Sequence, residues 1–298
     1  MRRLLLVVVA ATLASAQETK DEKPFKWDPR QRTRVVAGAR TFFDYEVTSA
    51  FEMTFVSQTG ATAVTSHSAA SESYRWVRNV LGVESGQISE AQVQVERWKL
   101  DKTGVPDETL EGKTITLKKT GSKLDATIAD DEGVSADARE WLRSEVFRCS
   151  GRLASTEGIE DLLVVREPAM VTTGCDWTRD PKAVALGLLQ TTEVDPQRSS
   201  VTGHLGDVHL ARGVHYGKAS VDAALQVRKL DLHEVRYEDG ALVEITWRYE
   251  GSLERARRDE GSWSLTFRTT GRRKLGESLD AEMRNERTET LRCGPAKK

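Results

Sequence analysis

The sequence predicts a mainly antiparallel β protein of the α+β class, in which a curved sheet or half-barrel packs on one or two helices; a β-sandwich is the second choice. Long runs rich in Val, Thr, Tyr, Phe and Trp alternate between apolar and polar residues along much of the chain. Two of these runs change parity midway, which is typical of the bulges that curve a sheet. The clearest helical spacing of apolar side chains lies at residues 135–147.

The first 16 residues have the three parts of a secretory signal peptide. A basic start at Arg2 and Arg3 precedes an apolar run from Leu4 to Leu13, and Ala14-Ser15-Ala16 supplies the small residues of a cleavage site. The run is too short to span a bilayer as a helix, and no cysteine follows it for lipid attachment. We therefore expect cleavage after Ala16, a secreted or periplasmic location, and no transmembrane segment in the mature chain.

Composition limits the possible partners. The chain has 298 residues, of which 38% are hydrophobic and 30% are charged. Loss of Arg2 and Arg3 with the signal peptide moves the net charge from −2 to −4. This balance gives no electrostatic reason to bind nucleic acid. Because no fixed-period repeat or low-complexity tract divides the chain, residues 34–150 and 151–298 are expected to form two β blocks of one continuous domain.

The first β block follows a polar leader, residues 17–33, which is expected to be flexible. Residues 41–57 and 62–80 are dense in aromatic and β-branched side chains, which fit a half-buried pleated surface. The next strand has its apolar residues on one parity up to Val95 and on the other from Trp98. A bulge is expected between them.

Turn and cap residues predict the elements that follow. Thr120-Gly121-Ser122 favours a hairpin. Ser135 is a suitable cap for the predicted helix over 135–147. Asp180-Pro181 predicts a second helical start, with apolar residues running to Leu189, although a buried loop fits the same residues.

The second β block ends in strands with clean alternation. Trp263 and Leu265 alternate with polar residues, as in an antiparallel strand with one buried and one solvent-exposed face. Glu238-Asp239-Gly240 predicts a tight hairpin that joins residues 235–237 to residues 243–249.

Three cysteines would share an oxidising compartment: Cys149, Cys175 and Cys293. An odd number allows one disulfide and leaves one thiol. The Cys149–Cys175 pair closes the shortest loop and is preferred, with a contribution of roughly 3 kcal/mol under the chain-entropy model. The Cys175–Cys293 pair is the alternative.

Two short stretches carry a family resemblance. Leu110-Glu111-Gly112-Lys113-Thr114 enters a strand before the predicted helix, and Glu167-Pro168-Ala169-Met170-Val171 is followed by Gly174 and Trp177. Their order resembles that of uncharacterised exported bacterial proteins of a β-rich, domain-of-unknown-function type, over residues 40 to 290. The resemblance implies a curved antiparallel sheet like that of periplasmic lipoprotein carriers, and it supplies no catalytic residues. This chain departs from the pattern at Cys175, between Gly174 and Trp177, so the resemblance does not define the local turn.

One constellation combines the residue types of a reactive or metal-binding site. Asp207 and His209 are two residues apart, so on a strand they share a face. His204 points to the opposite face unless Gly206 bends the chain, and His215 joins the other two only if the strand register is kept. Asp207, His209 and His215 are therefore weak metal candidates, while exposed or packed strand histidines fit the same pattern. No metal or other cofactor is expected.

The sequence contains neither a G-x-S-x-G nucleophile turn nor an HExxH zinc motif. We expect a non-catalytic exported protein that binds an apolar ligand, such as a lipid, or a cell-envelope protein on its curved sheet. Core packing is preferred for most of the prominent aromatic residues, and some could line a concave ligand surface: Tyr74, Trp76, Trp98, Trp247, Tyr249, Trp263 and Phe267. Two alternatives stay open, namely a structural or interaction module without a ligand cavity and a hydrolase with a site near His204–His209.

Overall fold

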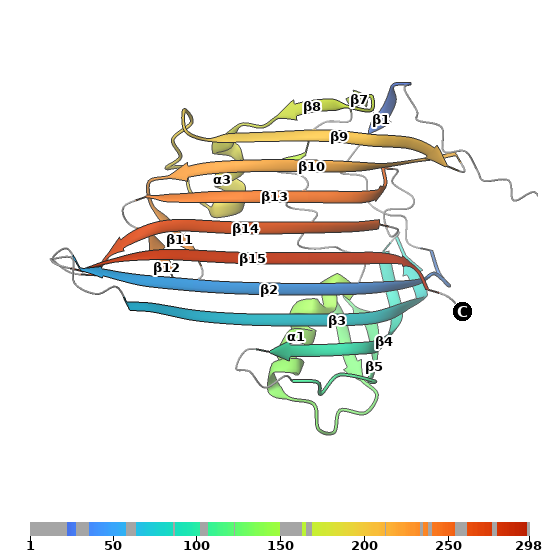
Figure 1. Ribbon diagram of the computed structural model, residues 1–298. Helices are drawn as coiled ribbons and strands as arrows, with labels where there is room; N and C mark the ends of the chain where they lie inside the picture. The colour runs from blue at the N-terminus through green and yellow to red at the C-terminus, as the bar shows by residue number, and fades with distance from the viewer. Residues whose placement is uncertain are drawn as a thin grey trace, which may run out of the picture.

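A single large, open sheet organises the chain (Figure 1). The computed structural model describes residues 23–27, 36–57, 64–85, 87–101, 107–121, 123–149, 163–164, 169–211, 213–232, 235–237, 240–253, 261–275 and 279–296. The predicted signal peptide lies outside these residues. Within them, no helix has the length and apolar character needed to cross a membrane.

The strands of the sheet, in chain order, are β2 (Arg40–Ser57), β3 (Val64–Glu84), β4 (Gln87–Asp101), β5 (Thr114–Thr120), β6 (Lys123–Ile128), β8 (Cys175–Thr178), β9 (Ser200–Ala211), β10 (Val214–Val227), β13 (Ala241–Ser252), β14 (Gly261–Lys274) and β15 (Leu279–Pro295). Two small antiparallel pairs lie outside it: β1 (Phe25–Trp27) with β7 (Ala169–Val171), and β11 (Leu230–Leu232) with β12 (Val235–Tyr237). The helices are α1 (Ala136–Cys149) and α3 (Pro181–Leu189).

The spatial order of the strands is β6-β5-β4-β3-β2-β15-β14-β13-β10-β9-β8, and every neighbouring pair is antiparallel. The predicted mainly antiparallel fold with a curved, unclosed sheet is confirmed. β2 pairs with β15 along its whole length, which brings the two predicted β blocks together in one sheet.

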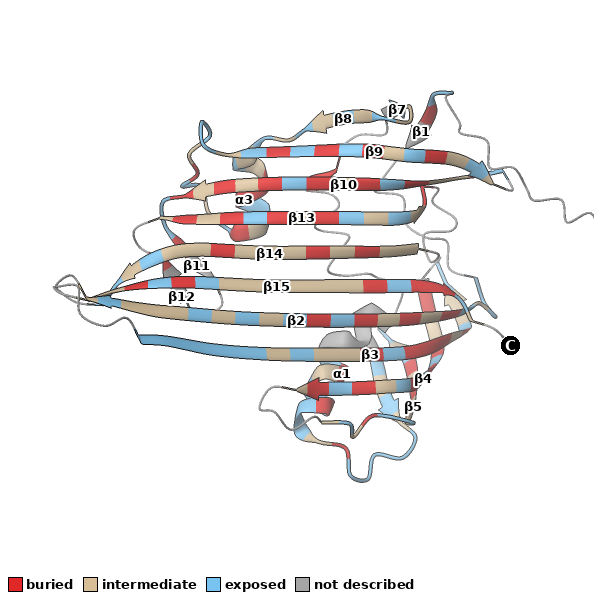
Figure 2. Cartoon of the chain, in the orientation of Figure 1, coloured by how far each residue is buried: buried red, intermediate tan, exposed pale blue. Residues whose placement is uncertain are grey.

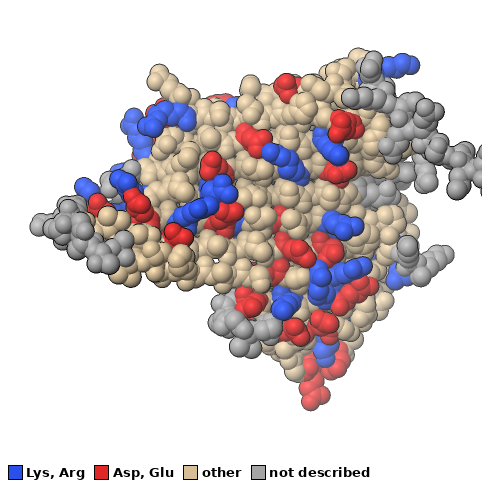
Figure 3. Space-filling view, viewed as in Figure 1, with Lys and Arg blue, Asp and Glu red and all other residues tan. Residues whose placement is uncertain are grey.

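Buried and exposed residues alternate along the strands of the sheet, so its two faces differ in burial (Figure 2). On β13, Val243, Ile245 and Trp247 are buried, whereas Glu244 and Arg248 between them are exposed. Both helices lie behind the sheet in Figure 1, on the side of the buried residues. We call this side the inner face and the opposite, solvent-exposed side the outer face. The outer face carries interspersed positive and negative side chains (Figure 3).

An aromatic cluster fixes α1 to the inner face. The ring of Trp141 lies 4.3 Å from that of Trp98 in an edge-on contact and 4.9 Å from that of Tyr74. The predicted bulge explains how β4 contributes to this cluster: Arg75 pairs with Arg97, while the next residue pairs with Val95. The extra residue restores the inward direction of Trp98, so the expected bulge is confirmed.

The predicted cap of α1 is part of a small polar network. The Ser135 Oγ accepts a hydrogen bond from the Ala138 N–H (3.0 Å) and donates one to Asp107. The backbone N–H and the hydroxyl of Thr109 donate two more to the same carboxylate. Burial opposes ionisation of Asp107, but these hydrogen bonds outweigh it and hold the pKa of the carboxyl below its ordinary value.

Replacing Ser135 by alanine should lower the free energy of unfolding by about 1–2 kcal/mol, because the first turn of α1 loses its cap. The folded pKa of Asp107 lies below its ordinary 3.8, so its contribution is present above that pH and is lost as the pH falls through the folded pKa. Urea unfolding at pH 7 and at acid pH measures both effects. Glu140→Ala, on the exposed side of α1, is the control and should change stability by less than about 0.5 kcal/mol.

The second predicted helix is confirmed as α3. The Asp180 Oδ1 accepts a hydrogen bond from the Lys182 N–H at 3.0 Å, Pro181 occupies the first turn, and the helix ends at Gln190, whose φ is 54°. Thr120-Gly121-Ser122 joins β5 to β6, as its hairpin signal predicts.

The hairpin predicted at Glu238-Asp239-Gly240 is wrong. β12 pairs with β11, and β13 begins at Ala241, opposite Val227 at the end of β10. The second of the two runs that change parity does so between Val227 and Leu230, and this change marks the end of β10 and the start of β11, so the bulge predicted there is wrong. The small antiparallel pair β11–β12 is inserted between β10 and β13 in the chain. The turn residues alone could not distinguish this arrangement from a direct hairpin.

The predicted leader also contains ordered structure. Phe25–Trp27 forms β1 and pairs with β7. Phe25 is buried, and its ring stacks on the imidazole of His215 at 4.3 Å. This aromatic anchor explains why a polar segment docks on the folded body.

The alternative disulfide Cys175–Cys293 is ruled out by topology. Cys175 lies on β8 at one edge of the sheet and Cys293 on β15, five strand positions away, or roughly 24 Å. The structure has Cys175 as a thiol, and burial raises its pKa. The side chain of Cys149 lies outside the described ones, so the Cys149–Cys175 pair stays a prediction.

Candidate functional site

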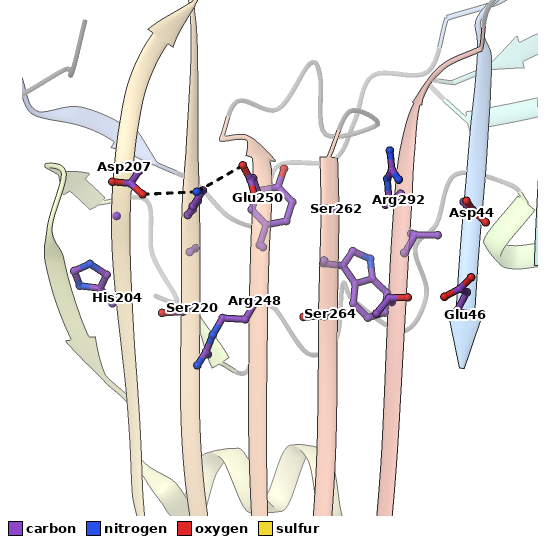
Figure 4. Close-up of a pocket in the computed structure, with 17 residues that line it drawn as sticks. Asp44, Glu46, His204, Asp207, Ser220, Arg248, Glu250, Ser262, Ser264 and Arg292 are labelled. Atoms are coloured by element: carbon purple, nitrogen blue, oxygen red, sulfur yellow. Dashed lines mark ion pairs between the residues drawn. The ribbon is translucent and has the colours of Figure 1, made fainter. Parts of the chain in front are cut away.

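The outer face carries a shallow groove of about 710 Å³ that crosses the strands from β9 to β2 (Figure 4). β14 supplies its floor, because Ser262 and Ser264 are the outward side chains there and both are short. On one side, the Arg248 guanidinium turns away from this floor and bonds to Asp222 on β10, at 2.8 and 3.1 Å. The neighbouring hydroxyls are left uncovered.

Most charges around the groove are balanced by neighbours. Lys218 lies between Asp207 (3.8 Å) and Glu250 (3.9 Å), as the dashed lines in Figure 4 show. On the other side, Arg97 of β4 holds Asp44 at 2.6 Å. Exposed pairs of this kind each contribute only about 0–1 kcal/mol to stability, so they shape the groove more than they stabilise the fold.

Arg292 is the exception. Its guanidinium makes no ion pair or side-chain hydrogen bond with any residue in the described part of the chain, although it lies next to Ser262 on one strand and Asp44 on another. A guanidinium beside free hydroxyls can bind a carboxylate or another planar anion with two parallel hydrogen bonds.

Two of the candidate residues from the sequence meet in this groove. A bulge next to Asp207, which has a φ of 50°, places both Asp207 and His204 on the outer face. The His204 Nδ1 lies 2.6 Å from an Asp176 carboxylate oxygen on β8, and Ser220 lies opposite His204 on β10. The cross-strand order Asp176, His204, Ser220 therefore contains the residue types of a hydrolytic triad.

The geometry of a triad is not assembled, however. No hydrogen bond joins Ser220 to His204 in the described structure, whereas an activated nucleophile needs a base within about 2.6–3.2 Å. Both members of the His204–Asp176 pair are largely exposed, with 51% and 78% of their side-chain surface accessible. This arrangement can bind a polar group but does not activate a serine.

The remaining candidate histidines pack on aromatic rings. His209 lies on the Tyr216 ring at 5.9 Å, and His215 stacks on the buried Phe25 of β1. Neither His209 nor His215 lines the groove, so the predicted grouping of both histidines with Asp207 is not formed there. No group of three His, Cys, Asp or Glu side chains that could hold a metal ion occurs among the residues that the structure describes.

The inner face contains a polar cluster in an otherwise apolar surface. We define it as Tyr45, Glu72, Tyr74, Arg287 and Glu289. The Tyr45 hydroxyl donates to Glu289 (2.7 Å), Arg287 Nε donates to the same carboxylate (2.8 Å), and the Tyr74 hydroxyl donates to Glu72 (2.6 Å). Only 12% of the Glu289 side chain is accessible.

The electrostatics of this cluster favour a hydrogen-bond donor as its partner. Burial disfavours the charge on Arg287, but the hydrogen bond and charge of Glu289 outweigh it and raise the pKa of Arg287. Two carboxylates then face one guanidinium, so the cluster is net negative. Glu72 has a carboxylate bonded by a tyrosine hydroxyl and no ion pair with another described residue.

Large apolar side chains near this cluster stay only half-buried, and we call them the inner apolar strip: Phe51, Met53, Phe55 and Phe267. They belong to β2 and β14, which flank β15 in the centre of the sheet. In Figure 1, α1 lies behind β2 to β4 and α3 behind β9 to β13. The prediction that most aromatics are core is confirmed for Tyr74, Trp76, Trp98, Trp247 and Trp263, which are buried.

Sequence reasoning missed the residues that make both surfaces distinctive. Asn285, Arg287 and Glu289 share the parity of Met283 and Leu291, so polar residues interrupt an apolar series within one strand. That interruption could have been used to predict polar side chains on the inner face. The role of Arg292 could not be predicted in this way, because whether its guanidinium has an ion partner among the described residues depends on which strands flank β15.

Comparisons with known proteins leave the family unassigned. No family model and no curated protein matches the chain. Among solved structures, the chain is similar to one described as "Lipid-protein interactions in lipovitellin", with a TM-score of 0.30 and 11% sequence identity. The alignment covers 88% of this chain and 26% of that one, so this chain spans about a quarter of its length. A superposition this loose assigns neither a shared fold nor a ligand.

Proposed function

We propose that this is an exported, non-catalytic binding protein that holds an amphipathic lipid against the inner face of its sheet. The observation that carries the proposal is the inner apolar strip beside the partly buried polar cluster. Apolar side chains that stay half-buried on a core-facing surface gain about 25 cal/mol for each Å² that a ligand covers. The acyl chain would lie on Phe51 and Phe267, and the head group would reach Glu72.

The head group follows from charge. A net negative cluster favours an amine or hydroxyl donor over a carboxylate or phosphate that has no donor of its own. Export is supported by the basic, apolar and small-residue segments of residues 1–16. The intact mass of the protein recovered from the cell envelope should therefore match a chain that starts at Gln17.

Replacing Phe267 by serine should weaken binding of a fluorescent lysophosphatidylethanolamine at least about tenfold, because the apolar strip loses a large contact. Fluorescence titration of the delipidated protein measures this. Thr266→Ser, the adjacent residue on the outer face, is the matched control and should bind like the original protein. Thermal unfolding of both variants separates loss of the ligand surface from loss of the fold.

A second variant tests the head-group assignment independently. Glu72→Gln keeps the shape of the side chain and removes one negative charge. It should reduce the preference for the amine-bearing probe over a fluorescent fatty acid. Equal affinity of the original protein for both probes contradicts the head-group assignment, and no saturable binding of either contradicts the proposal as a whole.

The outer groove supports a second candidate function, binding of a polar ligand with one negative charge. The specific observation is the guanidinium of Arg292 beside the uncovered hydroxyls of Ser262 and Ser264. A sugar acid combines a carboxylate for the arginine with hydroxyl groups for the serines.

Arg292→Ala should abolish binding of a uronic acid oligosaccharide, measured by calorimetry, because the carboxylate loses its cationic partner. Arg272→Ala is the control: Arg272 lies on the outer face of β14 outside the groove and bonds to Glu282 at 2.6 Å. An equal loss in both variants would indicate non-specific charge attraction, and binding of a neutral oligosaccharide with the same affinity would contradict the role of Arg292.

A further inference from the structure

The first third of β3 has a described neighbour on only one side. β2 pairs with β3 from Val64 to Asn79, but β4 pairs with it only from Ser71 onward. Between Val64 and Ala70, the second edge of β3 therefore meets no other described strand, and Figure 1 shows this part of β3 running along the open border of the sheet. Its outward backbone N–H and C=O groups therefore have no partner strand among the residues that the structure describes.

This border is also accessible. Every residue from Val64 to Ala69 is exposed, and Val64 retains 61% of its surface. The segment reads Val-Thr-Ser-His-Ser-Ala-Ala, which contains no Pro, Lys, Arg, Asp or Glu. Its one ionisable side chain is His67, which lies 3.5 Å from Glu52 on the adjacent strand β2.

Natural sheets usually protect such edges with charges, proline, bulges or a covering element. The two edge strands of this sheet, β8 and β6, are protected in such ways. β8 is four residues long and carries the exposed Asp176, and α1 packs beside β6. The Val64–Ala70 edge carries no charge, proline or bulge, and no described helix or strand covers it, so it is a template for an added strand.

We propose that two copies of this chain pair through their Val64–Ala70 edges, antiparallel about a twofold axis at His67. An antiparallel pair of identical strands is self-complementary, because each residue meets its symmetry mate across the axis. In this register Thr65 faces Ala69 of the second copy, and Ser66 faces its Ser68. Small, uncharged side chains then meet in every pair except the central one, where His67 meets its symmetry mate.

The absence of Lys, Arg, Asp and Glu along the Val64–Ala70 edge favours a second copy of this chain over a charged partner. A basic or acidic segment would find no complementary charge along these seven residues, whereas a second copy supplies an equally uncharged strand. A contact of seven residues is small for a permanent dimer, so the association should be reversible and depend on protein concentration. The two copies would form one continuous sheet.

Sedimentation velocity of the mature chain, from about 1 µM to 0.1 mM, tests the pairing. We expect a monomer–dimer equilibrium. The double variant T65K/A69K places lysines opposite each other in the proposed register and should weaken the dimer at least about tenfold. Thr48→Lys is the control, since Thr48 is exposed on the outer face of β2, away from the edge, and it should leave the equilibrium unchanged.

A crosslink tests the axis itself. Under mild oxidation, His67→Cys should form a disulfide-linked dimer at the twofold axis, whereas Thr48→Cys should not. A chain that stays monomeric up to 0.1 mM, or a dimer that T65K/A69K does not weaken, overturns the proposal. Loss of folding in the lysine variant, judged by circular dichroism, leaves the decision to the crosslink.

Discussion

Replacing Trp98 by alanine should destabilise the protein severely, by about 3–5 kcal/mol. Trp98 has 0% of its surface exposed, stacks on Tyr74 at a ring distance of 4.6 Å, and meets Trp141 of α1 edge-on. The substitution removes a large apolar volume and the contact that holds α1 on the sheet. Aromatic pairs add about 0.5–1.5 kcal/mol beyond the area that they bury.

Urea unfolding followed by far-ultraviolet circular dichroism measures this loss, and near-ultraviolet circular dichroism reports the aromatic cluster. Lys99→Ala is the matched control, because Lys99 is the next residue of β4 and is exposed on the outer face. It should change the free energy of unfolding by less than about 0.5 kcal/mol. Equal effects of the two substitutions would contradict the assignment of the inner face as the core.

Adding one methyl group at Gly203 should destabilise the protein by about 1–3 kcal/mol through overpacking. A Cβ built at this position lies 2.0 to 2.4 Å from three ring atoms of Trp177. The indole therefore has to leave, and it loses the hydrogen bond of its Nε1 to the Leu163 carbonyl oxygen at 3.1 Å. Because Trp177 is on the edge strand β8, its displacement should loosen that border of the sheet.

Thermal unfolding of Gly203→Ala measures the destabilisation, and a red shift of tryptophan emission should accompany it. Gly206→Ala is the control on the same strand. Its Cβ would meet only the flexible ring of His204, at 3.2 Å for the closest atom, and on the solvent-exposed face. A Gly203→Ala protein as stable as Gly206→Ala would mean that Trp177 does not pack over Gly203.

The sequence allowed the strand interiors and their faces to be predicted because alternation is a local property. The parity change between Val95 and Trp98 located a bulge correctly, and Ser135 and Asp180 located both helix starts. The error at Gly240 arose where two turns follow each other within a few residues. Local turn residues indicate that the chain reverses direction, but they do not indicate which strand the next strand pairs with.

Strand neighbours could not be predicted, and both candidate surfaces depend on them. β2 and β15 pair although Thr48 and Thr288 are far apart in the chain, and such long-range pairing leaves no local signature. The groove exists because the short side chains of Ser262 and Ser264 lie beside β13, whose Arg248 turns away from them to Asp222. By contrast, Arg287 and Glu289 could have been recognised as inward polar residues from the alternation of their own strand.

Photocrosslinking with a diazirine-bearing lysophosphatidylethanolamine tests the central claim most directly, because adjacent residues of one strand face opposite sides of the sheet. Peptide mass spectrometry would locate the label. The predicted result is label on Phe51 and Phe267 and none on their neighbours Ala50 and Thr266. Label on Ala50 and Thr266, or no saturable labelling of the protein, would contradict a lipid site on the inner face.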